Sequence, residues 1–281
     1  MRKILITGAT SGFGKLLVEE FLKNGDMVLA SGRNLLDRGG ILSDLKATYP
    51  GKLQEYTLDV TKADELKSIV RDISEQHGAI DILINNAGYG LFGALEDLKD
   101  EAIRDQMEVN FFGTLNVTKA FLPLLRISKG KIFNFSSVFG FMGFPITSVY
   151  CASKFAVEGL TESLRGELAP HGVQICLIEP GGYNTKFGNS LSWGVEDSSP
   201  YRDQVRNYQA VRVKISDGKK SQDPREVSQG LLKLSLQSKL PMRKPFGKDA
   251  GISWFLKNCL PTWLYWGIMD RVFKKVFLKK N

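Results

Sequence analysis

A glycine-rich turn near the amino terminus constrains the fold more strongly than any other feature of the sequence. Residues 3–7 (KILIT) form a short, mostly apolar run, which is typical of a buried parallel strand. Residues 7–14 (TGATSGFG) follow, and apolar residues then recur at helical spacing: Leu16, Leu17, Phe21 and Leu22. A glycine turn between a strand and a helix lets the backbone approach a pyrophosphate. The spacing GxxxGxG differs from the standard GxGxxG fingerprint, so an ordinary glycine turn is the alternative.

The rest of the chain alternates between two kinds of pattern. Strands are predicted near residues 3–7, 27–31, 54–58, 80–85, 130–136 and 173–178. Helices are predicted near residues 13–24, 63–76, 100–126, 149–169 and 225–237. This alternation predicts an α/β protein with a Rossmann-type, doubly wound parallel sheet in three layers. Ligands of such sheets bind at the carboxyl ends of the strands, where every motif below falls. We expect one domain over residues 1–250, with a substrate loop at about 186–222, and a basic helical extension over 251–281.

Tyr150 and Lys154 form the second constellation. Four residues are one helical turn, so both side chains project from the same helix face. An ammonium beside a phenol favours the phenolate, which predicts a lowered pKa for Tyr150 and a general acid/base role. Ser137 lies thirteen residues upstream of Tyr150, and Asn110 precedes it.

Together these residues resemble the short-chain dehydrogenase/reductase superfamily in its single-domain form. Residues 7–14 match its TGxxxGxG, residues 85–88 its NNAG, and residues 180–185 its PGxxxT. The catalytic tetrad of the family is matched in order and spacing by Asn110, Ser137, Tyr150 and Lys154. The likeness runs continuously from residue 1 to about 190. Beyond Thr185 the sequence departs from the pattern, in the part where the family places substrate specificity.

The resemblance implies a role for each member of the tetrad. Tyr150 would donate a proton to the developing alkoxide, and Ser137 a hydrogen bond to the same oxygen. Lys154 would hold the nicotinamide ribose, and Asn110 a water that links Lys154 to solvent. Two structural alternatives remain, with Asn110 as a helix-kink residue and Ser137 as a strand-end hydroxyl. Ser136 competes with Ser137 for the serine role, and the family spacing favours Ser137.

The end of the second predicted strand bears on the choice of cofactor. Gly32 stands at the family's acidic position and Arg33 follows it, which favours a 2′-phosphate and hence NADP(H) over NAD(H). Arg33 could instead be a solvated loop residue. Asp59 and Val60, after the third predicted strand, match the family's adenine-contacting pair, with a helix cap as the alternative for Asp59. Tyr183 and Thr185 are expected to flank the nicotinamide carboxamide. The full set of expected cofactor-binding residues is Gly8, Thr10, Ser11, Gly12, Phe13, Gly14, Arg33, Asn34, Asp59, Val60, Asn85, Ala87, Gly88, Tyr150, Lys154, Pro180, Gly181, Tyr183 and Thr185.

Aromatic residues crowd the predicted mouth of the site, which suits a hydrophobic ligand. The expected substrate pocket consists of Phe92, Phe139, Phe144, Phe187 and Trp193, although Phe139 and Phe141 could instead belong to the core. The segments around Tyr150 and after the NNAG motif resemble the hydroxysteroid and retinol dehydrogenase branch. That likeness implies an NADP-dependent oxidoreductase that interconverts a bulky apolar alcohol and its ketone or aldehyde. A ketoacyl-thioester reductase and a nonenzymatic NADPH-binding sensor are the alternatives, and the complete tetrad argues against a sensor.

The carboxyl-terminal quarter is strongly basic, with 17 Lys/Arg against 5 Asp/Glu over residues 206–281. Residues 262–280 place tryptophans and other apolar residues at helical spacing beside lysines. Such a helix can lie on an anionic membrane surface, or it can dock on its own domain or on a second subunit. No nucleic-acid-binding module accompanies the charge.

Cysteine and histidine usage bears on the compartment and on metal binding. The three cysteines lie far apart without metal-ligand spacing, and the chain has only two histidines. We therefore expect no metal site and a cytoplasmic protein with reduced thiols, peripheral to the inner face of a membrane if the basic helix binds there. The family resemblance further implies a homodimer or homotetramer, formed through the long helices around residues 100–126 and 149–169.

Overall fold

A seven-stranded parallel sheet forms the centre of the molecule. The computed structural model describes residues 1–33, 35, 40, 42–184, 191–217 and 222–277. Its strand order is β3-β2-β1-β4-β6-β7-β9, so the order reverses between β1 and β4. The strands are β1 (Lys3–Thr7), β2 (Met27–Gly32), β3 (Leu53–Thr57), β4 (Ile82–Asn85), β6 (Lys131–Phe135), β7 (Gln174–Pro180) and β9 (Arg243–Phe246). The predicted doubly wound α/β fold is confirmed.

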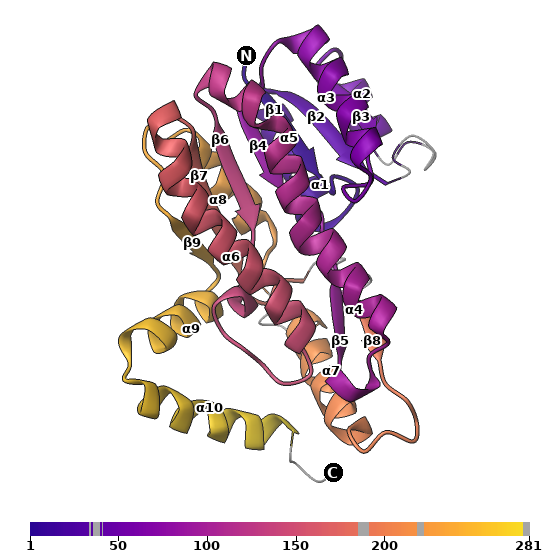
Figure 1. The fold of residues 1–281 in the computed structure, drawn as a ribbon, viewed down its shortest axis with the longest axis vertical. Coiled ribbons are helices and arrows are strands. Elements are labelled where there is room, and N and C mark those ends of the chain that lie inside the picture. Colours follow the sequence, from indigo (N-terminus) through magenta and orange to yellow (C-terminus); the bar gives the residue numbers. More distant parts are fainter. Residues whose placement is uncertain (34, 36–39, 41, 185–190, 218–221, 278–281) are drawn as a thin grey trace.

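Helices cover both faces of this sheet and complete the three layers (Figure 1). They are α1 (Gly12–Lys23), α2 (Ser43–Thr48), α3 (Ala63–His77), α4 (Asp100–Met107), α5 (Gly113–Ser128), α6 (Ser148–Leu168) and α8 (Arg225–Ser235). Short turns of 3-10 helix lie at Leu95–Asp97, Val138–Gly140 and Ala169–His171, and a π-helical turn lies at Glu108–Phe112. The helix predicted over residues 100–126 is therefore interrupted by the π-helical turn that contains Asn110.

Alternation along the strands explains why the sheet is buried on both faces. Ile4 and Ile6 of β1 pack into the core beneath α1 and α8, whereas Leu5 points into the core beneath α3 and α5. All three side chains have no exposed surface. Because β1 is central, its carboxyl end, and the glycine turn that follows, are fixed on a rigid base.

Several elements that the sequence did not predict build a second lobe at the carboxyl ends of the strands. They are β5 (Gly90–Gly93), β8 (Leu191–Gly194) and α7 (Arg202–Asp217). The helix α9 (Lys248–Cys259) joins them and overlaps the helical extension that was predicted over residues 251–281. β5 and β8 pair in parallel as a separate two-stranded sheet. The expectation of a loop at about 186–222 is thus corrected, because β8 and α7 occupy much of that segment, while residues 185–190 and 218–221 lie outside the described residues.

The last helix, α10 (Thr262–Phe277), docks on its own domain. Phe273 and Phe277 pack against Phe144 with ring centroids 5.3 and 5.6 Å apart, and Phe277 lies 5.7 Å from Tyr208 of α7. One of the alternatives for this basic helix, docking on its own domain, is therefore what the structure shows. None of the helices in the described ranges combines the length and the apolar composition needed to span a bilayer.

Candidate active site

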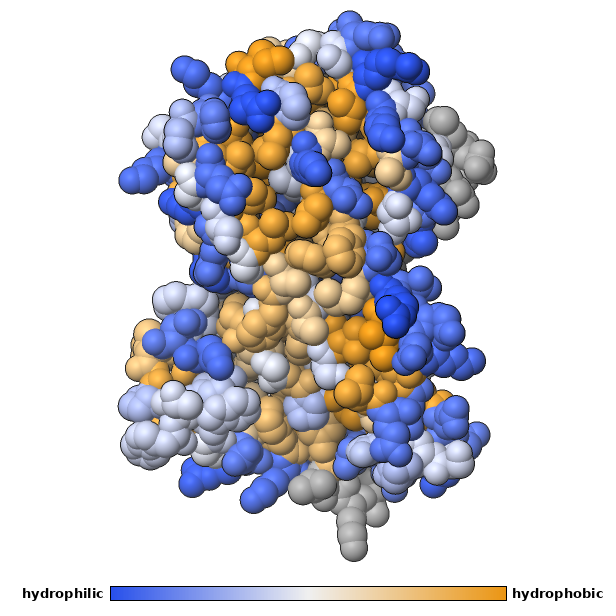
Figure 2. Space-filling view, in the orientation of Figure 1, coloured by the Kyte–Doolittle hydropathy of each residue, from blue (hydrophilic) through white to orange (hydrophobic). Residues whose placement is uncertain are grey.

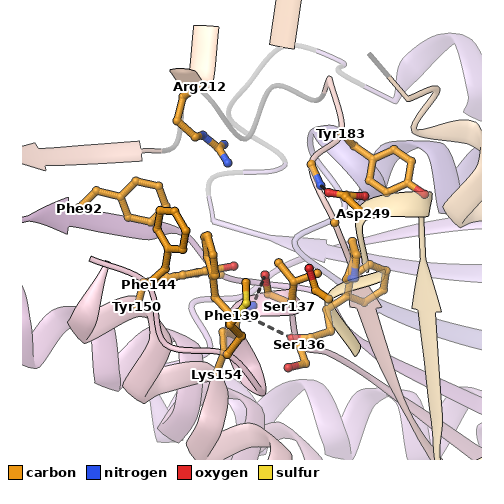
Figure 3. Close-up of a pocket in the computed structure, with 18 of the residues that line it drawn as sticks. Phe92, Ser136, Ser137, Phe139, Phe144, Tyr150, Lys154, Tyr183, Arg212 and Asp249 are labelled. Carbon is orange, nitrogen blue, oxygen red and sulfur yellow. Dashed lines mark hydrogen bonds between the residues drawn. The ribbon is translucent and has the colours of Figure 1, made fainter. Parts of the chain in front are cut away.

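A cavity of about 270 Å³ lies at the carboxyl ends of β4, β6 and β7, between the sheet and the second lobe (Figure 3). Its lining combines the expected catalytic side chains with aromatic walls and with residues from α7 and α9. Those that bear on the argument are Phe13, Phe92, Ser136, Ser137, Phe139, Phe144, Tyr150, Lys154, Gly181, Tyr183, Tyr208, Arg212 and Asp249. Residues far apart in the sequence therefore meet in one pocket at the place where parallel α/β sheets bind ligands.

The glycine turn is compact and held in place by Asn86. Gly8 and Gly12 have positive φ angles of 66° and 51°, which only glycine adopts without strain. A Cβ atom at Gly14 would collide with the carbonyl oxygen of Gly8. The side-chain amide of Asn86 donates to the carbonyls of Thr7 and Gly8, at 3.0 and 3.1 Å. Asn86 belongs to the NNAG motif, so the motif itself could have identified it, although the predicted set omitted it.

The N-terminus of α1 faces this turn. Ser11 is the N-cap residue, yet its hydroxyl makes no capping hydrogen bond, which leaves it available at the helix end. Phe13 reaches the cavity, where its ring packs edge-on to that of Tyr183 at 5.6 Å. Phe13 therefore joins the turn to the pocket, and the first N–H groups of α1 adjoin it in the chain.

The side chain of Asn85 makes hydrogen bonds within the domain core, at the end of β4. This buried side chain donates to Thr118 Oγ1 and to Asn134 Oδ1, both at 2.8 Å. Asn134 in turn donates to Thr161 of α6 at 2.8 Å. This chain of hydrogen bonds ties β4 and β6 to the helices that cover them.

Gly32 and Arg33 lie at the end of the predicted site that is expected to bind adenosine. A Cβ at Gly32 would lie 3.0 Å from Thr10 Cγ2, so the site has little room for a side chain there. Arg33, the next residue, is exposed. Asn34 lies outside the described residues.

The pair Asp59 and Val60 has structural partners of its own. Asp59 Oδ1 accepts hydrogen bonds from the backbone N–H and the hydroxyl of Thr61, at 3.0 and 2.8 Å, just before α3. Val60 is buried against Gly113 at the start of α5. Asp59 thus closes a turn ahead of α3, whose N-cap is Lys62, so it does not cap the helix as the alternative supposed, and its contact with adenine stays a prediction.

Tyr150 is a buried phenol whose pKa is raised, not lowered. Its side chain is 6% exposed, and the rings of Phe92 and Phe139 lie 5.6 and 6.2 Å from its own. Burial raises the pKa of Tyr150 to about 12, although a hydrogen bond with Ser137 and the charge of Arg212 oppose the rise. The expected lowering is thus corrected, because desolvation outweighs the hydrogen bond with Ser137 and the charge of Arg212. At neutral pH the phenol is protonated and can donate.

Lys154 lies one helical turn beyond Tyr150, as predicted, and is equally buried. Its ammonium donates to the carbonyl of Phe135 at 2.9 Å and lies 5.9 Å from the centre of the Tyr150 ring. Burial lowers the pKa of Lys154 to about 8, and the carboxylate of Glu158 opposes the fall. Whether Lys154 keeps its positive charge near neutral pH therefore depends on the charged groups around it.

The structure distinguishes Ser137 from Ser136. Ser137 follows β6, accepts a hydrogen bond from the backbone N–H of Phe139 at 3.2 Å, and has a hydrogen bond with Tyr150. The hydroxyl of Ser136 lies instead beside Gly140, where an added Cβ would collide with it. The side chain of Glu158 borders the same position. Of the two serines, Ser137 is the one paired with the phenol.

Asn110 lies in the π-helical turn, an irregularity often found at functional sites. Its amide donates to the carbonyl of Tyr89 at 2.9 Å and to Ser153 Oγ at 3.1 Å, and its Oδ1 accepts from the N–H of Tyr89 at 3.0 Å. Asn110 Oδ1 and Lys154 Nζ both border Gly88, within 3.0 and 3.6 Å of where its Cβ would stand. The side chains of Asn110 and Lys154 thus come together at Gly88, the last residue of the NNAG motif. The water expected beside Asn110 stays a prediction.

The loop after β7 is held by a residue that sequence analysis missed. Asp249 of α9 accepts hydrogen bonds from the N–H of Gly182 at 2.6 Å and from Gln222 Nε2 at 2.8 Å. Tyr183, in the same loop, donates its hydroxyl to Glu226 at 3.1 Å. No local pattern connects Asp249 to this loop, since the contact depends on how β9 and α9 return to the sheet. Thr185 lies outside the described residues.

The residues expected to form the aromatic substrate pocket lie at different depths from the cavity. Phe92, Phe139 and Phe144 line the cavity, whereas Trp193 stands behind Phe92 with its ring edge-on at 5.4 Å. The position of Trp193 in the lining is thus corrected, because the β5–β8 pairing places it in a second layer. Phe187 lies outside the described residues. Tyr208, Val211 and Arg212 of α7 were missed, because their segment carried no recognisable motif.

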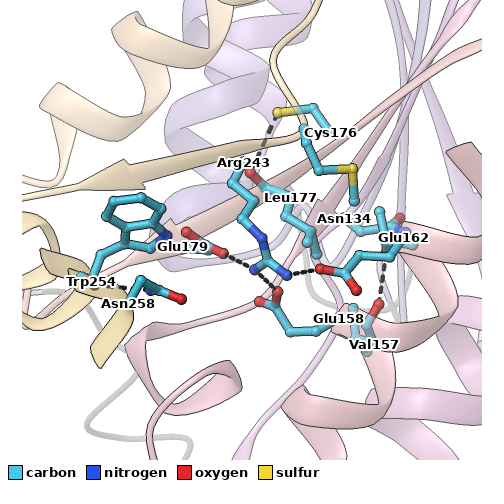
Figure 4. Close-up of polar contacts among 12 residues, drawn as sticks. Asn134, Val157, Glu158, Glu162, Cys176, Leu177, Glu179, Arg243, Trp254 and Asn258 are labelled. Carbon is cyan, nitrogen blue, oxygen red and sulfur yellow. Dashed lines mark hydrogen bonds and ion pairs between the residues drawn. The ribbon is translucent and has the colours of Figure 1, made fainter. Parts of the chain in front are cut away.

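Behind the pocket, Arg243 of β9 is surrounded by three glutamates (Figure 4). It forms ion pairs with Glu158 and Glu162 of α6 and, at 2.6 Å, with Glu179 of β7. Burial and the nearby Glu158 raise the pKa of Glu179 to about 7, although Arg243 opposes the rise. Through Glu158 this cluster borders Lys154, so it belongs to the electrostatic surroundings of the site.

Comparisons with known proteins agree with this geometry. Residues 2–194 match the family described as short chain dehydrogenase. The chain is 35% identical over 247 residues to the 3-ketodihydrosphingosine reductase of Bacteroides thetaiotaomicron, covering 87% of each. It is 39% identical over 190 residues to human 17-beta-hydroxysteroid dehydrogenase type 1, covering 66% of this chain and 57% of that one. A solved short-chain dehydrogenase from Streptomyces avermitilis superposes with a TM-score of 0.81 at 30% identity, over 98% and 96% of the two chains. The chain therefore belongs to the short-chain dehydrogenase family of oxidoreductases, which act between alcohols and carbonyl compounds.

Proposed function

We propose that the protein reduces the carbonyl of a hydrophobic ketone or aldehyde, or oxidises the matching alcohol, with NADP(H) as cofactor and Tyr150 as general acid/base. The observation that carries the proposal is the buried, protonated phenol of Tyr150, hydrogen-bonded to Ser137 inside a cavity. In reduction the phenol donates its proton to the oxygen that becomes an alkoxide, and the Ser137 hydroxyl donates a hydrogen bond to the same oxygen. Lys154 places a positive charge close to the phenol while the proton leaves.

The residues around the glycine turn fit a dinucleotide. Gly8 and Gly14 leave no room for side chains in the turn, Phe13 beside them lines the cavity, and the N-terminus of α1 favours negative charge there. Ser11 and the backbone of the turn would hold the pyrophosphate. The nicotinamide supplies a hydride when the cofactor is bound.

A preference for NADP(H) is supported by the contrast between Gly32 and Arg33. Little space for a side chain remains at Gly32, and the exposed Arg33 that follows it carries a guanidinium that would pair with a 2′-phosphate. Replacing Arg33 by alanine should weaken NADPH binding at least tenfold and leave NADH binding nearly unchanged, as measured by fluorescence titration. Equal affinities of the wild-type protein for the two cofactors would contradict this preference.

The substrate class can be tested with purified protein, NADPH and a panel of carbonyl compounds graded in size and polarity. The panel includes a steroid ketone, a long-chain ketone, a ketoacyl thioester and small polar aldehydes. Turnover that rises with apolar bulk supports the hydrophobic-substrate proposal, because the walls of the cavity are Phe92, Phe139 and Phe144. Turnover of the thioester alone favours the ketoacyl reductase. Tight NADPH binding without any turnover favours the sensor.

A matched pair of variants tests the assignment of the serine. Ser137→Ala should lower kcat by roughly 10²- to 10³-fold, the usual cost of removing a donor that stabilises a developing oxyanion. Ser136→Ala should cost far less, since its hydroxyl lies beside Glu158 and not beside Tyr150. Equal losses in both variants would count against the proposed role of Ser137.

Self-association through α5 and α6 is supported by the surface of these helices. Phe112, at the end of the π-helical turn, is 40% exposed and Phe155 of α6 is 44% exposed. Figure 2 shows apolar side chains gathered along the face where α5 and α6 run in Figure 1. We expect a homodimer or homotetramer by light scattering, and Phe155→Lys should shift it toward the monomer.

Contact with an anionic membrane is supported by the outer face of α9 and α10. Trp263 is 75% exposed, Phe255 is 56% exposed and Trp266 is 44% exposed. Lysines accompany them, and Lys257 lies 4.7 Å from the ring centre of Tyr265. Tryptophans beside lysines suit the headgroup region of a bilayer, which would place a cytoplasmic protein at the inner face. Flotation with anionic and neutral liposomes tests this, and no flotation of the wild-type protein would refute it.

A further inference from the structure

Among the described residues that line the pocket, Arg212, Lys154 and Asp249 carry charged groups, and many of the others are aromatic. Arg212 lies on the third turn of α7, and its guanidinium points into the cavity from the side opposite Lys154 (Figure 3). Its Cζ lies 5.8 Å from the ring centre of Phe92. The same Phe92 ring packs against Tyr150, so Arg212 and the catalytic phenol share one wall.

The contacts of Arg212 hold it in position without neutralising it. The guanidinium lies over the Phe92 ring, and this cation–π contact holds it at the wall of the cavity. Burial raises the pKa of Tyr208, and a hydrogen bond with Arg212 is among the interactions that oppose the rise. Both partners are uncharged groups. The charge of Arg212 therefore remains directed at the cavity.

The other arginines of α7 behave differently. Arg202 pairs with Asp203 and Arg206 pairs with Asp197, both at the outer surface. Among the side chains that the structure describes, no carboxylate forms an ion pair with Arg212. A guanidinium carries five N–H donors in a planar fork that matches a carboxylate or a phosphate, and low surrounding polarity strengthens such a pair.

We infer that Arg212 binds an anionic group of the substrate, a carboxylate or a phosphate, while the carbonyl of the same molecule lies at Tyr150. The inference rests on the proposed function and narrows it: the substrate is an acidic amphiphile with an apolar body between its carbonyl and its anion. A long-chain ketone with an amino group is disfavoured, because its ammonium would meet a cation. Arg212 is thus the specificity-determining residue of the pocket.

A purely electrostatic role makes a different prediction. Burial raises the pKa of Tyr150, and the charge of Arg212 lowers it in part. A residue that acted only in this way would change the turnover of neutral and anionic substrates by the same factor. It would also move the pH profile of both.

The test compares keto acids from 4-oxopentanoate to 7-oxooctanoate with their methyl esters, and includes a keto phosphate of similar length. The variants are Arg212→Ala, Arg212→Lys and Arg212→Glu, with Arg206→Ala as the matched control on the same helix. We expect Arg212→Ala to lower kcat/KM for the acid by about 10- to 100-fold, mainly through KM, and that of the ester by less than about threefold. Arg212→Lys should retain part of the preference, Arg212→Glu should reverse it, and Arg206→Ala should change neither. Whichever of the keto acid and the keto phosphate has the higher kcat/KM with the wild-type protein identifies the preferred anion.

An equilibrium measurement separates this inference from the proposed function. Octanoate, octyl phosphate and octanol are titrated into the NADPH complex of the wild-type protein and of Arg212→Ala. Tighter binding of an anion than of octanol, lost in Arg212→Ala, supports the inference even if no ketone is turned over. Equal binding of all three overturns it. An equal loss of acid and ester turnover in Arg212→Ala also overturns the inference, as does a wild-type protein that reduces esters but not acids. Neither of these two results would contradict the proposed oxidoreductase activity.

Discussion

Replacing Glu158 by glutamine should make the protein lose activity at a lower pH. Glu158 follows Lys154 by four residues on α6, so the two side chains share one helix face. Burial lowers the pKa of Lys154 to about 8, and the Glu158 carboxylate opposes that fall. Burial also raises the pKa of Glu158 itself, but Arg243 favours its ionised form. Without the carboxylate, the pKa of Lys154 must fall further.

The size of this shift follows from Coulomb's law. Two unit charges about 6 Å apart, a typical separation for residues one helical turn apart, interact by about 2.8 kcal/mol at an effective dielectric constant of about 20. Arg243 beside Glu158 cancels part of that field, so we expect a shift of about one pKa unit, or about 1.4 kcal/mol. A lysine is charged below its pKa. Activity that needs the ammonium is therefore lost above about pH 8 in the wild-type protein and above about pH 7 in Glu158→Gln.

The assay is the pH dependence of kcat/KM for the cofactor, which reports groups of the free enzyme. Glu162→Gln is the control, because Glu162 also pairs with Arg243 and loses the same charge, but its side chain is 54% exposed and two turns from Lys154. Its alkaline limb should coincide with that of the wild-type protein. A Glu158→Gln profile that coincides with the wild-type one, or an equal shift in both variants, would refute the reasoning.

Two further predictions concern stability and the glycine turn. Arg243→Met should lower the free energy of unfolding by about 3–5 kcal/mol at pH 8, since it leaves buried carboxylates without a cation. The loss should shrink as the pH falls from 8 to 6, because Glu179, whose pKa is about 7 beside Arg243 and higher without it, takes up a proton. Urea titrations at pH 8 and pH 6 check this. Gly14→Ala should weaken NADPH binding more than about tenfold, because the new Cβ collides with the carbonyl of Gly8. Gly166→Ala, in open space on α6, should leave binding unchanged and raise stability by up to about 1 kcal/mol, as calorimetry and titration can show.

Local patterns were sufficient to predict the centre of the molecule. Strands of the parallel sheet are short apolar runs, and the glycine turn after β1 marks where strand becomes helix. Tyr150 and Lys154 lie one turn apart on α6, and this spacing survives whatever the helix packs against. The structure brings both to the same cavity as Ser137, which the family spacing favoured over Ser136.

The walls of the pocket could not be predicted, because they depend on contacts between distant segments. Arg212 reaches the cavity only because α7 packs across β5, and Asp249 only because α9 follows a seventh strand. β5 and β8 are four residues each and rich in glycine, which is too short for a clear periodicity. The pKa of Tyr150 was predicted in the wrong direction, because spacing reveals a neighbouring charge but not the desolvation that outweighs it.

The most direct test of the proposed mechanism compares Tyr150→Phe with the wild-type protein in two assays. The first is the single-turnover rate of NADPH oxidation with a carbonyl compound that the wild-type protein reduces, and the second is the dissociation constant of NADPH. If Tyr150 is the proton donor, its loss slows turnover by roughly 10²- to 10⁴-fold while NADPH binding stays within about threefold of the wild-type value. A Tyr150→Phe protein that turns over at the wild-type rate would contradict the account.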